Sequence, residues 1–360
     1  MYKVLVMGAG KIGVTVAALL NNSGDYHAYV SDVKPPYELP IIKNNPIEFV
    51  SLNVKEADTI IKFIREQQIV AIISCLPFNL TIEVAKIAHE CGIDYFDPTE
   101  DVATTLAVSE LAKNSKSTFA PQCGLAPGFI SIAANSLMEG MDEIYAVKMR
   151  VGALAQSTSN VLKYAFTWSI DGLINEYIHP CVVVEDGIKK SIPALGGLES
   201  ITVDGDVYEA FYTSGGVGSM PDTYNGKVSY LDYKTIRYPG HCEKMAFLLQ
   251  DLKLRENPLL LKEILERVIP HVADDKIVIY VSVTGYIKGR LIEKTYTNTL
   301  YPVMCADNKF SAIQMTTAAG ICTVVDLVVK HKKLAGLVKQ EQVSLSELVA
   351  NRFGSYYAKA

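Results

Sequence analysis

Three glycines near the start of the chain, Gly8, Gly10 and Gly13, stand at the spacing of a phosphate-binding turn. An apolar run at 3–7 precedes them and a segment with helical periodicity at 14–20 follows. In such a strand–turn–helix unit the first glycine allows the tight turn, the second lets a pyrophosphate approach the backbone, and the third lets the helix lie close to the strand. The spacing in this context predicts a dinucleotide site, because the glycine pattern alone would be a weak signal.

The predicted cofactor is NAD rather than NADP. Backbone N–H groups of the first helical turn, at Lys11 and Ile12, would bind the phosphates. A second apolar run at 27–31 ends in Asp32. A carboxylate at this position accepts hydrogen bonds from the adenosine ribose and repels a 2′-phosphate. Lys34 lies close by and leaves NADP open as the alternative.

Strand and helix patterns alternate through the first third of the chain. Apolar strands are expected at 69–74, 93–96 and 117–121, with helical segments between them. This alternation predicts an α/β fold with a doubly wound parallel sheet of the Rossmann type. Ligands lie beyond the carboxyl ends of the strands in such sheets, so Asp97 should line one crevice with the glycine turn. The loop residues expected in the same crevice are Ser74, Cys75, Leu76 and Pro77.

The pattern changes after residue 124. Longer strands joined by short turns predict a second, α+β substrate domain over 125–310, after a dinucleotide-binding domain over 1–124. Residues 311–360 contain two helix candidates, which we expect to return to the first domain.

Composition excludes several classes of partner. The net charge is −5 and Lys and Arg do not cluster, which argues against nucleic acid. We find no run approaching about 18 apolar residues and no leader, so we expect a cytoplasmic protein without a membrane partner. The seven cysteines are scattered and never form C-x-x-C, and the six histidines lack ligand spacing, so we predict neither a disulfide framework nor a metal.

Four side chains are candidates for chemistry on a small molecule. His241 follows a Pro-Gly pair and is the first candidate for proton transfer, because imidazole titrates near neutral pH. Arg237 suits a substrate carboxylate, although a surface ion pair is the alternative. Asp97 lies past a strand end and could equally be a turn residue. Trp168, the only tryptophan, could form a wall of the pocket or fill the core.

Several stretches together resemble the saccharopine dehydrogenase-like amino-acid dehydrogenases, and within them the lysine 6-dehydrogenase branch. They follow the family's order along almost the whole chain. The stretches are Val4–Gly13, "ISCLPF" at 73–78, "YFDPTED" at 95–101, "GLAPGF" at 124–129, "TWSIDGLINEY" at 167–177 and "IRYPGHCEKM" at 236–245.

The resemblance implies a fold, an activity and an assembly. The family joins a Rossmann domain to an α+β domain that completes the active site and often forms a homodimer. Its chemistry is hydride exchange between a nicotinamide and a carbon that bears nitrogen on an amino acid. The implied partner is therefore a small amino-acid substrate.

Departures from the family pattern favour a basic substrate. Saccharopine-forming members have "GLDPG" where this chain has Ala126, and an arginine where it has Asp171. An arginine suits a glutamyl carboxylate, whereas an aspartate suits a cationic amine. The resemblance therefore implies lysine or a related amino acid as substrate. A saccharopine dehydrogenase or reductase activity and a dinucleotide-binding sensor without turnover remain the alternatives.

Overall fold

The computed structural model describes residues 1–36, 38–332, 334 and 336–358. Contacts divide the chain into two units. The first contains Met1–Phe129, Val303–Phe310 and Gln314–Ala360, and the second contains Ile130–Pro302 and Ser311–Ile313. The boundaries predicted from the sequence were 124 and 310.

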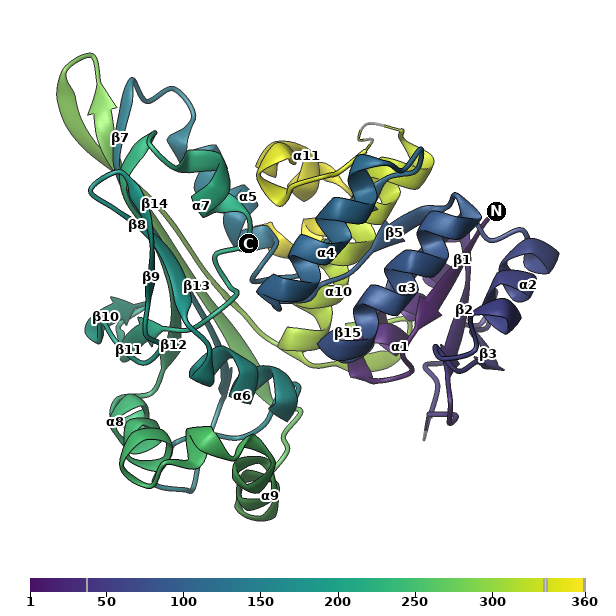
Figure 1. Cartoon of the computed structure of the whole chain (residues 1–360), viewed down its shortest axis with the longest axis horizontal. Helices are drawn as coiled ribbons and strands as arrows, with labels where there is room; N and C mark the ends of the chain where they lie inside the picture. The colour runs from purple at the N-terminus through teal and green to yellow at the C-terminus, as the bar shows by residue number, and fades with distance from the viewer. Residues whose placement is uncertain (37, 333, 335, 359–360) are drawn as a thin grey trace. The chain divides into compact units, whose positions relative to one another are not determined.

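The first unit is built on a six-stranded sheet in the order β3-β2-β1-β4-β5-β6 (Figure 1). All neighbouring strands in it are parallel. The strands are β1 (Tyr2–Met7), β2 (Tyr26–Asp32), β3 (Glu48–Ser51), β4 (Ala71–Ser74), β5 (Asp94–Phe96) and β6 (Phe119–Ala120). The strand order reverses between β1 and β4, where doubly wound sheets bind their ligands. The predicted Rossmann sheet is thereby confirmed.

Helices connect these strands and cover the sheet. They are α1 (Lys11–Asn22), α2 (Ala57–Gln67), α3 (Phe78–Cys91) and α4 (Val102–Lys113). Side chains of α2, α3 and α4 form one buried core with Leu5 and Ile72 of the sheet. The apolar stripe of α2 is Ile60, Ile61 and Ile64, at the spacing that places them on one helix face.

The C-terminal part of the chain returns to the first unit. Its elements are the hairpin β15 (Val303–Cys305) and β16 (Asn308–Phe310), α10 (Ala312–Val325), the π-helical η3 (Asp326–Lys330), the short η4 (Gln340–Gln342), α11 (Leu345–Ala350) and η5 (Gly354–Tyr357). Residues 333, 335 and 359–360 of this predicted segment lie outside the described residues.

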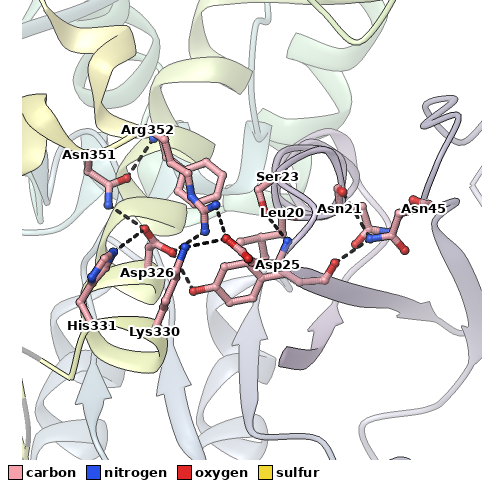
Figure 2. Close-up of polar contacts among 12 residues, drawn as sticks. Leu20, Asn21, Ser23, Asp25, Asn45, Asp326, Lys330, His331, Asn351 and Arg352 are labelled. Atoms are coloured by element: carbon pink, nitrogen blue, oxygen red, sulfur yellow. Dashed lines mark hydrogen bonds and ion pairs between the residues drawn. The ribbon is translucent and has the colours of Figure 1, made fainter. Parts of the chain in front are cut away.

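A buried carboxylate fixes this return. Asp326 is 1% exposed and accepts hydrogen bonds from Tyr26 at 2.9 Å, Asn351 at 2.8 Å and Arg352 at 2.8 Å (Figure 2). Burial pushes the pKa of Asp326 upward, but the bonds from Asn351 and Arg352 outweigh burial and lower it. Asp25 adds an ion pair with Lys330 of η3 at 2.6 Å.

One helix passes a test of length and mean hydropathy for a membrane span, although it contains no run of about 18 uncharged apolar residues. Ala312–Lys330 has 19 residues and is apolar enough to cross a membrane. Its most apolar window is 89% buried inside the protein, as in the core helix of a soluble domain. The buried, fully bonded Asp326 near its end is also typical of a protein interior.

The second unit contains a mixed sheet in the order β10-β11-β12-β7-β13-β14, with β8 and β9 added beside β12. Its strands are β7 (Glu143–Ala155), β8 (Cys181–Glu185), β9 (Ile188–Ile192), β10 (Glu199–Val203), β11 (Asp206–Tyr212), β12 (Val228–Arg237), β13 (Asp275–Ile287) and β14 (Arg290–Leu300). Only the pairing of β12 with β7 is parallel among the described pairs of this sheet. The predicted α+β domain is confirmed.

Helices pack on this sheet. They are α5 (Phe129–Met138), α6 (Ile170–Ile178), α7 (Met220–Tyr224), α8 (His241–Ala246) with the π-helical η1 (Phe247–Asp251), η2 (Leu254–Glu256) and α9 (Pro258–Val268). Side chains of α6, α8 and α9 share a buried core with Phe211 of β11. This core sets the surroundings of His241, which begins α8.

Candidate functional site

Backbone contacts explain the glycines of the predicted turn. Gly8 has φ +108°, and a Cβ there would lie 2.6 Å from the Cys75 carbonyl oxygen. A Cβ on Gly13 would lie 1.9 Å from the Gly8 carbonyl oxygen, so neither position admits a side chain. A Cβ on Gly10 would meet no atom within 4 Å, which leaves open space beside the start of α1. That is the arrangement needed for a phosphate to approach the backbone.

The helix start is free to bind an anion. No side chain caps α1, whose first residues are Lys11 and Ile12. Their N–H groups, with that of Gly13, precede the first hydrogen bond of the helix, which Val14 donates to the Gly10 carbonyl at 3.1 Å.

Asp32 lies at the end of β2, directly beside this turn. Its carboxylate accepts hydrogen bonds from the Ala9 N–H at 2.9 Å and the Val33 N–H at 2.7 Å. A pocket of about 280 Å³ adjoins it. Its lining is Met7, Ser31, Asp32, Val33, Leu52, Asn53, Val54, Lys55, Leu76 and Leu80. A largely apolar pocket whose lining includes one carboxylate, Asp32, and one lysine, Lys55, suits the adenosine half of a dinucleotide.

The predicted loop after β4 contacts the glycine turn. The Cys75 N–H donates to the Met7 carbonyl at 2.7 Å, and Ser74 is hydrogen-bonded to Thr81 at 3.2 Å. Leu76 lines the pocket and Pro77 precedes α3. Burial raises the pKa of Cys75 to about 12, so its thiol stays protonated and is no nucleophile near neutral pH.

Asp97 follows β5 and is 0% exposed. Its Oδ1 accepts from the Thr99 N–H at 2.8 Å and the Gln122 N–H at 3.4 Å. Its Oδ2 has no partner among the described residues, and the Tyr95 hydroxyl beside it is out of hydrogen-bonding geometry. Burial raises the pKa of Asp97 to about 6 and that of the nearby half-buried Glu100 to about 7. Both carboxyls can therefore exchange a proton near neutral pH.

A buried polar cluster lies in the second unit. Arg237 at the end of β12 is 2% exposed and donates through Nε to the Tyr177 hydroxyl at 2.9 Å. That hydroxyl lies 3.1 Å from Nε2 of His241, whose Nδ1 lies 2.9 Å from the Leu162 carbonyl oxygen. The Arg237 guanidinium also packs over the Tyr164 ring, 5.4 Å from its centre. Two residues predicted from the sequence, Arg237 and His241, are thus brought together.

His241 differs from the expectation that its imidazole titrates near neutral pH. It is 1% exposed, and both ring nitrogens have hydrogen-bond partners. Burial and then the positive charge of Arg237 lower its pKa to about 3. At neutral pH the imidazole is therefore uncharged, and both of its nitrogens already have hydrogen-bond partners. Titration near neutral pH, the reason for which His241 was predicted to transfer protons, is thus wrong for this residue.

Glu209 places the start of α8. It lies opposite Arg237 on the neighbouring strand β11. Its carboxylate accepts from the Gly240 N–H at 2.7 Å and the Cys242 N–H at 2.6 Å, the two amides on either side of His241. A carboxylate at a helix start is stabilised by these N–H groups.

Asp171 and Trp168 occupy less buried positions. Asp171 lies in the first turn of α6 and forms an ion pair with Lys262 of α9 at 2.8 Å, with half of its side chain exposed. The structure therefore does not bring Asp171 to the Arg237 cluster. Trp168 is half-buried and packs against the core that contains Tyr164 and Tyr177.

Three residues of these sites were not predicted from the sequence. Tyr177 is the last letter of the "TWSIDGLINEY" stretch, and Glu209 has no local motif, because its role depends on pairing across two strands. Glu100 lies in the "YFDPTED" stretch beside Asp97. Within the described residues no group of three or more His, Cys, Asp or Glu side chains could hold a metal.

Two family models match the chain. The saccharopine dehydrogenase NADP binding domain matches residues 4–122, and the saccharopine dehydrogenase C-terminal domain matches residues 124–354. Together they span both units.

One solved structure shares the fold of this chain, and two others resemble it more distantly. Apo histidine-tagged saccharopine dehydrogenase (L-Glu forming) from Saccharomyces cerevisiae is 14% identical, with a TM-score of 0.74 over 99% of this chain and 96% of that chain. The C. glutamicum DAP dehydrogenase in complex with DAP is 13% identical, with a TM-score of 0.49 over 99% and 98% of the two chains. An engineered D-amino acid dehydrogenase bound to NADP⁺ is 13% identical, with a TM-score of 0.48 over 99% of both chains. The last two likenesses are too distant to support an argument.

The glycine turn, the pocket beside Asp32 and the family match agree on a nicotinamide dinucleotide as the ligand of the first unit. The second unit supplies a buried, cationic cluster matched by the C-terminal family domain. The chain belongs to the saccharopine dehydrogenase family of oxidoreductases.

Proposed function

We propose that the protein is an NAD-dependent dehydrogenase that oxidises a C–N bond of an amino acid, with lysine or a related amine-bearing amino acid as substrate. The observation that carries this proposal is the buried Arg237 guanidinium, which is held by neutral groups and suits a carboxylate ligand. The glycine turn supplies the site for the hydride acceptor.

The reaction needs a neutral amine and a proton acceptor. A bound NAD⁺ would supply the hydride acceptor for the C–H next to the amine, and addition of water with loss of ammonia would then leave a carbonyl compound. Asp97 and Glu100 have pKa values of about 6 and about 7 and can accept a proton in this range. His241 is less suited, because its pKa is about 3 and its nitrogens are occupied.

The choice of NAD rests on Asp32. Its carboxylate belongs to the lining of the pocket, and beside a bound ribose it would repel a 2′-phosphate. The matching family model is described as NADP binding, so the preference needs a direct measurement. We expect KM to be lower for NAD⁺ than for NADP⁺, and Asp32→Ser to reduce that difference by about tenfold or more. A wild-type preference for NADP⁺ would contradict this assignment.

The decisive experiment is NADH absorbance with purified protein and NAD⁺, against lysine, ornithine, saccharopine and other amino acids at mildly alkaline pH. NADH formation with lysine is the expected result. Turnover with saccharopine alone would favour the saccharopine dehydrogenase alternative. If no substrate gives NADH but calorimetry still detects NAD binding, the result would favour a dinucleotide-binding sensor.

We also propose a cytoplasmic homodimer, which follows from the family resemblance. Light scattering of the purified protein tests the dimer, and a mass of 39.5 kDa in solution, that of one chain, would contradict it.

A further inference from the structure

We propose that Tyr177 and His241 are positioning residues for Arg237. A directed chain of hydrogen bonds would hold the guanidinium so that one edge is free for a ligand carboxylate. This inference rests on the proposed function, in which Arg237 binds the carboxylate of an amino acid.

The direction of every hydrogen bond in the chain is determined by its ends. The Leu162 carbonyl can only accept, so Nδ1 of His241 carries the proton and donates at 2.9 Å. Nε of Arg237 can only donate, so the Tyr177 oxygen accepts at 2.9 Å. The hydroxyl proton of Tyr177 is then left for the unprotonated Nε2 of His241 at 3.1 Å. The tautomer of His241 thus follows from its neighbours.

These hydrogen bonds leave part of the Arg237 guanidinium available to a ligand. Nη1 donates to the carbonyl of Ile236 at 2.8 Å. In the part of the chain that the structure describes, Nη2 has no hydrogen-bond partner and Arg237 has no ion pair with a carboxylate. The charge of the buried Glu176 acts on Arg237 without a direct ion pair between them. A guanidinium that is 2% exposed and has no carboxylate in direct contact is costly to bury. A carboxylate ligand would supply both the charge and the acceptors.

A second buried group also indicates a ligand. The Tyr164 hydroxyl has no hydrogen-bond partner among the described residues, and the Tyr164 ring lies against both Arg237 and His241. Tyr164 is 4% exposed, so water does not readily satisfy it. A phenol donor and a guanidinium fork side by side suit one small carboxylate.

The test compares lysine with cadaverine, the diamine that lysine becomes without its carboxylate. In Tyr177→Phe we expect kcat/KM for lysine to fall about tenfold, mainly through KM, because Nε and Nε2 lose their partner. The value for cadaverine should stay within about twofold, since cadaverine presents no group to Arg237. The matched control is Tyr208→Phe. It removes a buried hydroxyl elsewhere in the same sheet, which donates to Asp206 and accepts from Lys276, and it should leave kcat/KM for both substrates unchanged.

An unchanged ratio of lysine to cadaverine activity in Tyr177→Phe would overturn the positioning role. Absence of wild-type turnover with every amino acid would instead count against the proposed function. In that case nitrogen-15 NMR of the wild-type protein still tests the hydrogen-bond chain, because it identifies the tautomer of His241. We expect the Nδ1–H tautomer unchanged between pH 5 and 8, and an Nε2–H tautomer would refute the chain.

Discussion

The second unit buries two arginines, Arg150 and Arg237, with different kinds of neighbour. Arg150 on β7 is 1% exposed and is neutralised by Glu199 and by both oxygens of Asp232, at 2.6 and 3.2 Å. Lys234 joins the same network through Glu199 at 3.0 Å. Arg237 is 2% exposed, and its hydrogen bonds go to a tyrosine and a backbone carbonyl.

The strands explain why these neighbours differ. Arg150 is in register with Lys234 of β12, and Lys234 and Arg237 lie three residues apart, so their side chains point to opposite faces of the sheet. On one face Arg150 is in direct contact with two carboxylates. On the other face Arg237 has no ion pair among the described residues, and the charge of Glu176 acts on it only without direct contact. Burial alone therefore does not distinguish a structural arginine from a binding arginine. The charge of its partners does.

Removing Arg150 should have the largest effect. In Arg150→Met two carboxylates lose their buried counter-charge, so we expect the free energy of unfolding to fall by about 3–5 kcal/mol. Urea denaturation measures it. Arg237→Met is the matched control and should leave stability unchanged or higher, because it removes a buried charge that has no carboxylate partner among the described residues. Equal destabilisation of both variants would contradict the proposed difference between a structural Arg150 and a ligand-binding Arg237.

Of these two arginines, Arg237 should have the larger effect on activity. We expect Arg237→Met to lower kcat/KM for the amino-acid substrate by about 100-fold, which corresponds to about 2.7 kcal/mol of transition-state binding. The KM for the dinucleotide should not change, because its glycine turn belongs to the other unit. Steady-state kinetics with both substrates varied would show this, and a variant with wild-type kcat/KM would exclude Arg237 from substrate binding.

The neutral state of His241 predicts an acid-side loss of stability. Its pKa falls from 6.5 to about 3 on folding, so unfolding takes up a proton at any pH between these values. Its contribution is complete above pH 6.5 and is lost as the pH falls toward 3. We expect the stability difference between wild type and His241→Gln to shrink by about 2 kcal/mol from pH 7 to pH 5.

Asp97 supplies a control of opposite sign. Its pKa rises from 3.8 to about 6, so its contribution is complete below pH 3.8 and is lost as the pH rises through 6. The stability of Asp97→Asn relative to wild type should therefore increase with pH over this range. A difference that is constant with pH for both variants would show that neither group is buried as described.

The smallest effect is expected at Asp171. If its ion pair with Lys262 is only a surface contact, Asp171→Asn and Lys262→Met should each change stability by less than about 1 kcal/mol and leave KM for lysine unaltered. A large rise in KM in Asp171→Asn alone would support the ammonium-binding role expected from the family comparison.

Local patterns allowed much of the fold to be predicted. The glycine turn and the strands around it each depend on residues close in sequence. The strand β3 and the helix α2 were missed, because residues 33–68 contain a long connection with only short apolar runs.

The arrangement of the Arg237 cluster could not be predicted in the same way. His241 reaches Leu162 and Tyr177, which lie 79 and 64 residues away in the sequence. Its pKa depends on burial produced by that packing, so the residue type alone suggested a titrating imidazole. Asp171 was predicted to bind substrate from its place in a family motif. In the structure, the pitch of α6 directs its side chain toward Lys262 rather than toward Tyr177.

The return of the C-terminal segment also affects how the protein is made. In the first unit Asp326 is hydrogen-bonded to Tyr26 and to Arg352, and the Phe129 ring stacks on Tyr357 with ring centres 3.7 Å apart. A ribosome therefore synthesises the whole second unit before the last pieces of the first are available. Until α10 has been synthesised, the surface that it covers in the dinucleotide-binding unit remains exposed to water. During synthesis the second unit can finish folding first, although the first unit begins the chain.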